Sequence, residues 1–261
     1  GCMVWGGALE LASADDKLIK VERPLNLDPE GILLASILAK KIAVRATHVL
    51  IDLPIGKGTK FQDMKRAKRV ERKFKQLGKL LGLEIKVILT KGHQPIGNGI
   101  GPALEARDNL LILQNKGPQD LKKKALYMAG LLLQMGGIKN GYKKAVEILE
   151  SGLAYKKFKE IVKAQGGNPN IQPNNIKIGK FKYGIKSKNS GKVKFIDNKV
   201  ITKIAKLAGA PEDKGAGIYL NFHIGDKVKK NDVLFIIYSE NKKKLDYSVD
   251  LCNKSKAMEL G

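Results

Sequence analysis

Apolar side chains dominate the chain just after Asp28. Between Ile32 and Ile42 they lie almost all round a helical wheel, which predicts a helix buried on most of its sides. Asp28 and Pro29 precede this run as a helix N-cap and a proline at the first helical position. Ser36 and Lys40 interrupt it four residues apart, so they share one face. Because a buried lysine needs a partner, we expect this face to border a wet cleft or an anion.

The chain then alternates between strand and helix patterns. Residues 48–53 form a short aliphatic run that predicts a buried strand ending at Pro54. Residues 61–81 have the pattern of a basic amphipathic helix, and residues 84–90 predict a second strand. Strand, helix and strand at this spacing indicate a βαβ unit with a parallel sheet.

The second half of the chain changes from helical to strand-like patterns. Residues 118–165 are predicted to be helical, with one amphipathic helix over residues 145–163, and a linker rich in Asn, Gly and Pro follows to residue 175. Beyond it, short apolar runs alternate with turns, and residues 224–238 resemble the half-motif of hammerhead-type β-folds. The lysine attachment motif of lipoyl domains is absent, so this likeness concerns shape only.

These patterns predict an α/β fold class and a division into segments. The fold combines parallel strand-helix units with a β-rich, hammerhead-like C-terminal α/β domain. We expect residues 1–46 to be a cleft segment from a helical lobe, residues 47–168 to be an α/β core with trailing helices, and residues 169–261 to be a C-terminal mixed α/β domain.

Composition narrows the classes of partner. The chain has 261 residues, 43% of them hydrophobic, and a net charge of +24, which suits anionic ligands. Its lysines are spread without aromatic interleaving, so nucleic acid is not favoured as a partner. No apolar run is long enough to span a membrane. Cys2 and Cys252 define neither a disulfide framework nor a metal site, so a reducing cytoplasm is the expected location.

Two glycine-rich loops follow the predicted strands. Residues 55–60 supply two glycines, a threonine hydroxyl and two lysines at the end of a strand, where α/β proteins bind ligands, so we expect an anion there. Residues 92–102 lack the dinucleotide fingerprint and predict no cofactor site. Glu105 and Arg107, just after this loop, are expected to form structural ion pairs.

Four stretches carry a resemblance to a known family. They are VWGGALELASADD, LDPEGILLASILAKK, HVLIDLPIGKGTK and PIGNGIGPALEARD, at residues 4–16, 27–41, 48–60 and 95–108. Together they resemble the thymidine phosphorylase family, and the loop PIGKGTK is more similar to its archaeal, AMP-cleaving members than to the bacterial pyrimidine enzymes. The resemblance implies phosphorolysis of AMP, with CMP and UMP as further substrates.

The resemblance also implies roles for particular residues. Asp28 matches the proton donor, Ser36 and Lys60 match nucleotide-binding positions, and Lys40 matches a base-contacting lysine of the pyrimidine enzymes. No metal or organic cofactor is implied, the partners are AMP and inorganic phosphate, and homo-oligomers are expected. Family members carry an upstream phosphate loop that this sequence lacks. With Gly1 in place of an initiator methionine, we expect the chain to be the C-terminal part of a longer enzyme.

Other interpretations of the same residues remain open. Asp28 can be an ordinary helix cap, Ser36 can bond back to its own helix, and Lys60 can be a solvated loop lysine. Thymidine or another pyrimidine nucleoside is the alternative substrate. A basic binding module without enzymatic activity is the alternative from a different class, since the net charge is +24.

Overall fold

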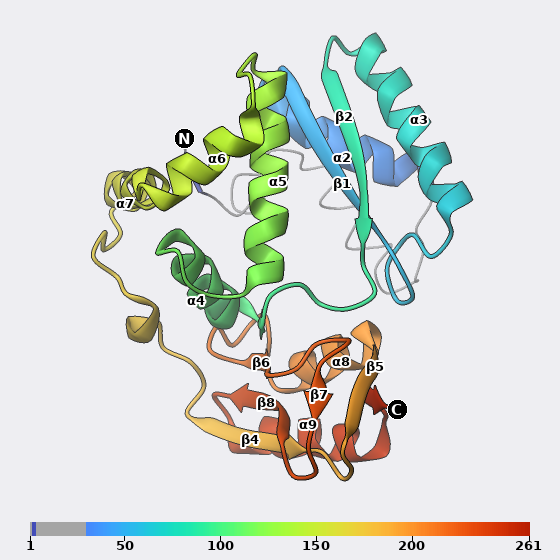
Figure 1. Ribbon diagram of the computed structural model, residues 1–261, viewed down its shortest axis with the longest axis vertical. Helices are drawn as coiled ribbons and strands as arrows, with labels where there is room; N and C mark the ends of the chain where they lie inside the picture. The colour runs from blue at the N-terminus through green and yellow to red at the C-terminus, as the bar shows by residue number, and fades with distance from the viewer. Residues whose placement is uncertain (1, 4–29) are drawn as a thin grey trace.

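The structure is a computed structural model that describes residues 2–3 and 30–261 (Figure 1). Asp28, the predicted cap and proton donor, lies outside the described residues, as does Pro29. Buried side chains gather in three hydrophobic cores, one around the first strands, one among the central helices and one in the C-terminal part. Among the described helices, none has both the length and the apolar character needed to cross a membrane.

Helix α2 (Glu30–Ala43) packs on one stripe only. Leu34 and Leu38 are 5% and 3% exposed and join the first core with residues of β1 and α3. Ile42, in contrast, is 44% exposed. The prediction that this helix is buried on most sides is therefore wrong for the described residues. Among them, its apolar contacts lie on one side of the helix.

The predicted βαβ unit is present. Strands β1 (His48–Ile55) and β2 (Glu84–Lys91) are parallel, and α3 (Met64–Leu80) connects them. Figure 1 shows α3 along one side of this strand pair and α5 along the other. The strand does not stop at Pro54, which stands opposite Thr90 in the register. Within the described residues β1 has a single strand neighbour, so the missing N–H of a proline is tolerated on its other edge.

Helices follow the strand pair and cover the second core. They are α4 (Pro102–Leu113), α5 (Gln119–Met135), α6 (Gly141–Glu150) and α7 (Leu153–Ala164). The predicted single helix over residues 145–163 is two helices, because Gly152 has a φ of 76° and turns the chain between them. A short 3-10 helix, η2 (Pro173–Asn175), lies in the linker that leads to the C-terminal part.

The C-terminal part is built from two antiparallel sheets and two helices (Figure 1). Its elements are β4 (Phe181–Lys186), β5 (Gly191–Ile196), α8 (Asn198–Leu207), β6 (Gly217–Leu220), β7 (Lys227–Val228), β8 (Val233–Ser239), α9 (Lys242–Lys254) and β9 (Met258–Leu260). With β3 (Gly99–Ile100), the strand orders are β3-β6-β8-β4 and β7-β5-β9. The α/β fold class predicted from the sequence is confirmed.

Strand β3 (Gly99–Ile100) belongs to the second glycine-rich loop, yet it pairs with β6. In this antiparallel pair Gly99 stands opposite Tyr219 and Ile100 opposite Ile218. The C-terminal sheet thus includes a strand from the segment we predicted to be the α/β core. This pairing ties the segment after β2 to the C-terminal part.

Candidate functional site

The loop Gly56–Lys60 follows β1 and closes on itself. The Gly56 N–H donates to the Phe61 carbonyl at 3.1 Å, and the Thr59 N–H donates to the Gly56 carbonyl at 3.1 Å. The Thr59 hydroxyl lies 2.8 Å from the Gly56 oxygen and 2.9 Å from the Phe61 oxygen. This hydroxyl, expected from the sequence to help bind an anion, is instead used to shape the loop.

Gly92, just after β2, supports the loop from one side. Its N–H donates to the Ile55 carbonyl at 2.8 Å. A Cβ on Gly56 would lie 2.7 Å from the Gly92 carbonyl carbon, and a Cβ on Gly92 would lie 2.6 Å from the Thr59 methyl carbon. Only glycine permits this approach, so the two loops form one closely packed unit.

The two lysines of the loop have different surroundings. The Lys57 ammonium lies 4.4 Å from the centroid of the Phe195 ring, within the range of a cation–π contact. Lys60 is exposed, and its carbonyl accepts a hydrogen bond from the Arg66 guanidinium at 3.4 Å. Both lysines are exposed, and Lys57 contacts the C-terminal part through the Phe195 ring.

Ser36 and Lys40 are both half-buried, one helical turn apart on α2. Their helix packs against β1 and α3 through Leu34 and Leu38. Contacts at the start of α2 fix its position on α3. Glu30 pairs with Arg69 at 2.8 Å and with Lys73 at 2.5 Å, and hydrogen bonds from these two cations lower the pKa of Glu30 from 4.5 to about 2.

A polar cluster that the sequence analysis missed lies toward the carboxyl ends of the strand pair. Asp52 on β1 accepts a hydrogen bond from the Thr90 hydroxyl at 2.6 Å and forms an ion pair with Lys124 of α5. The Lys124 ammonium also donates to Thr90 at 3.2 Å. The sequence did contain a signal for this cluster, namely an aspartate within an otherwise aliphatic strand. The cluster holds α5 against the sheet beside the candidate loop.

The second glycine-rich loop is organised by a buried acid. Asp108 is 1% exposed, and its Oδ2 accepts from the N–H groups of Asn98 and Gly99 at 2.8 and 2.7 Å. Burial raises the pKa of this carboxyl. The prediction that Glu105 and Arg107 form ion pairs is wrong for the described residues. Glu105 accepts from the Gly101 N–H at 3.0 Å, and Arg107 donates to the Pro173 carbonyl at 2.9 Å, because unpaired backbone groups of the loop and linker lie within reach.

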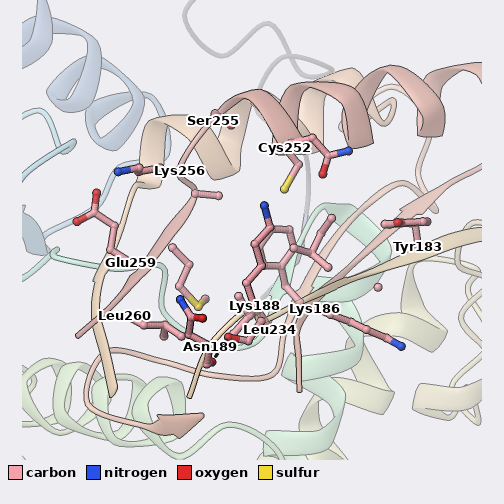
Figure 2. A pocket seen from close by; sticks show the side chains of 17 residues that line it. Tyr183, Lys186, Lys188, Asn189, Leu234, Cys252, Ser255, Lys256, Glu259 and Leu260 are labelled. Carbon is pink, nitrogen blue, oxygen red and sulfur yellow. Dashed lines mark hydrogen bonds between the residues drawn. The ribbon is translucent and has the colours of Figure 1, made fainter. Parts of the chain in front are cut away.

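A cavity apart from these loops lies between β4 and β9 (Figure 2). It measures about 860 Å³, and its lining includes Leu234 and Phe235. The Cys252 sulfur points into it (Figure 2), and burial raises the pKa of this thiol to about 11, so it is protonated at neutral pH. None of the residues lining this cavity belongs to the glycine-rich loops. Across the described ranges, no three His, Cys, Asp or Glu side chains are grouped to hold a metal ion.

Comparisons with known proteins show what the chain is similar to. The family model for the pyrimidine nucleoside phosphorylase C-terminal domain matches residues 192–259. The AMP phosphorylase of Pyrococcus abyssi is 51% identical over 99% of this chain and 52% of its own length. Those of Thermococcus kodakarensis and Thermofilum pendens are 50% and 45% identical, over 99% and 100% of this chain and 52% and 50% of their own lengths.

The resemblance recognised in the sequence is confirmed by these matches. Nearly the whole chain aligns with a C-terminal portion of archaeal AMP phosphorylases. The chain spans about half the length of the curated relatives it matches.

Proposed function

We propose that this chain is a C-terminal portion of an AMP phosphorylase and contributes part of its active site. The observation that carries this proposal is the 51% identity, over 99% of the chain, to a relative of that name. In the reaction, an oxygen of inorganic phosphate forms a bond to C1′ of the ribose while the bond from C1′ to the base breaks. The bonding electrons leave with adenine, which takes up a proton, and the other product is ribose 1,5-bisphosphate.

Asp28 is the proposed general acid, and Ser36 and Lys60 are the proposed AMP-binding residues. Because charge builds on the departing base, a proton donor at that position lowers the barrier. Phosphate and the 5′-phosphate are both anionic, so the site also needs cations and N–H donors. Lys60 fits this requirement, since it is exposed and lies in a loop at the carboxyl end of β1.

The family resemblance favours Lys60 over Lys57 as the ligand of the 5′-phosphate, since Lys60 is the loop lysine that matches a nucleotide-binding position. Lys57 lies with its ammonium against the Phe195 ring. An ammonium that meets a phosphate dianion forms a charge-assisted hydrogen bond, worth about 1.5–3 kcal/mol. An uncharged 5′-hydroxyl gains much less from the same cation. The site therefore discriminates AMP from adenosine through Lys60.

The test is to measure kcat/KM for AMP, adenosine and thymidine in the full-length enzyme and in its Lys60→Ala and Lys57→Ala variants. We expect Lys60→Ala to lower kcat/KM for AMP by about ten- to 100-fold and to change adenosine turnover by much less. Lys57→Ala is the matched control, with the smaller effect on AMP.

Two results would contradict the proposal. Equal losses on AMP and adenosine in Lys60→Ala would place Lys60 away from the 5′-phosphate. Thymidine as the best wild-type substrate would instead establish a pyrimidine nucleoside phosphorylase.

Further expectations from the sequence stay predictions. They are turnover of CMP and UMP, a homo-oligomeric state, a cytoplasmic location, and independence from metals and organic cofactors. The role of Lys40 as a contact to the base also stays a prediction, second in rank to Ser36 and Lys60.

A further inference from the structure

The loop that carries Lys60 rests against the C-terminal part of the chain. Gly58, with a φ of 86°, faces Asn198 at the start of α8, and a Cβ on Gly58 would lie 3.4 Å from the Asn198 Cβ. The Lys57 ammonium lies 4.4 Å from the centre of the Phe195 ring, at the end of β5. The junction of β5 and α8 therefore covers one side of the loop.

Asn198 also contacts the support beneath the loop. Its Nδ2 donates to the Gly92 carbonyl at 3.0 Å. Gly92 in turn donates to Ile55 at 2.8 Å and packs closely against Gly56 and Thr59. The side chain of Asn198 thus lies beside the loop at Gly58 and is hydrogen-bonded to Gly92, which supports the loop.

The chain after Gly92 is held by the C-terminal part as well. The His223 Nε2 lies 3.0 Å from the Gly97 carbonyl oxygen, and the Ile224 N–H donates to the Gln94 side chain at 2.6 Å. The Leu220 N–H donates to the Asn98 carbonyl at 2.8 Å. The segment after Gly92 is therefore held by the end of β6 and the residues that follow it, so the support at Gly92 can resist movement of the loop.

We infer that Asn198 is a positioning residue for the loop Gly56–Lys60, through which the C-terminal part takes part in nucleotide recognition. This inference rests on the proposed AMP phosphorylase function. Asn198 acts through the loop, and Lys60 is the group that meets the 5′-phosphate. A loop held in its binding conformation loses little freedom when the nucleotide arrives, so more of the contact energy appears as affinity.

The first experiment measures hydrogen exchange of the loop in the full-length enzyme. Asn198→Asp keeps the shape of the side chain but cannot donate to Gly92, and Asn198→Ala removes the group without adding charge. We expect the amide hydrogens of Gly56 and Thr59 to exchange about tenfold faster in both variants, because the support at Gly92 loosens.

Asn241→Asp is the matched control. Asn241 caps α9 in the same part of the chain by accepting from the N–H groups of Lys243 and Lys244, and aspartate accepts in the same way. Phe195→Leu, which removes the aromatic face beside Lys57 and keeps an apolar side chain, provides a second variant should both changes at Asn198 prevent folding. It should also speed exchange in the loop.

The second experiment measures kinetics with the same proteins. Asn198→Ala should raise KM for AMP about tenfold, with kcat and the KM for phosphate within about twofold of wild type. In a Lys60→Ala background it should add little, because both changes act on one contact. A general loss of structure would instead lower kcat and add to the effect of Lys60→Ala.

Each outcome separates the inference from the proposal on which it rests. Unchanged loop exchange in the variants at Asn198 and Phe195 would overturn the positioning role. Faster exchange with an unchanged KM for AMP would remove the link to nucleotide recognition. A wild-type enzyme that does not cleave AMP would overturn the proposed function, while loop exchange would still report whether Asn198 holds the loop.

Discussion

Glu30 shows how single residues connect the candidate site to its support. It is the first described residue of α2, and its carboxylate reaches two cations on α3, Arg69 and Lys73. Its side chain is 16% exposed, while the cations are 55% and 44% exposed, so solvent screens much of the attraction. The cluster sets the position of α2, the helix that carries Ser36, without contributing greatly to stability.

This cluster predicts a pH-dependent stability. Because folding lowers the pKa of Glu30 from 4.5 to about 2, its contribution is complete above pH 4.5 and is lost as the pH falls toward 2. At neutral pH, Glu30→Gln should lower the free energy of unfolding by about 1 kcal/mol, measured by denaturant titration. The difference from wild type should disappear near pH 2.

The control for this prediction is an ion pair within α3, the helix that also carries the two cations. Glu71 pairs with Lys75 four residues on, at 2.6 Å and with 51% of the lysine side chain exposed. Glu71→Gln should change the free energy of unfolding by less than about 0.5 kcal/mol. A Glu30→Gln difference that persists unchanged at acidic pH would show that Glu30 acts through something other than its charge.

Asp28 is the residue on which the proposed chemistry depends most. Asp28→Asn in the full-length enzyme should lower kcat for AMP by about 10²- to 10⁴-fold with little change in KM, because a general acid is lost while binding contacts stay. Asparagine caps a helix about as well as aspartate. A kcat within about threefold of wild type would therefore return Asp28 to the role of a helix cap.

At the scale of elements, the contact between the two glycine-rich loops decides the shape of the site. A Cβ on Gly56 would meet backbone atoms of Gly92 and His93 at 2.7 to 2.9 Å, and backbone cannot rotate out of the way. Gly56→Ala should lower the free energy of unfolding by about 1–3 kcal/mol, as measured by denaturant titration. It should also weaken AMP binding, because Lys60 moves with the loop.

Gly31 supplies the opposite case for the same substitution. It lies in the first turn of α2, and a Cβ there would have no atom of the other described residues within 4 Å. Gly31→Ala should raise the free energy of unfolding by about 0.5–1 kcal/mol, since alanine favours the helix. If both alanine variants were equally stable, steric contact between the loops would not be the reason for glycine at position 56.

At the scale of the whole molecule, strand β3 crosses the boundary we predicted at residues 168 and 169. It comes from the central segment and pairs with β6 of the C-terminal sheet. The division into residues 1–46, 47–168 and 169–261 stays a prediction. The contacts of Gly92, Gly97 and Asn98 with the C-terminal part mean that the support of the loop Gly56–Lys60 depends on residues more than 100 positions away.

The sequence by itself determined the elements whose formation is local. Alternation of apolar runs predicted β1, α3 and β2 in order, and the two glycine-rich loops were located from composition alone. Helical periodicity also placed Ser36 and Lys40 on one face. These features depend on side-chain spacing along a few turns, so they can be inferred without knowing the fold.

Only the tertiary structure decided how these elements are used. The contact of Lys57 with the Phe195 ring and the support that Asn198 gives to Gly92 both arise between residues distant in sequence. The same is true of the ion pair between Asp52 and Lys124. Such contacts follow from the packing of separate elements, and spacing along the chain carries no information about which distant side chain will fill a given neighbouring position.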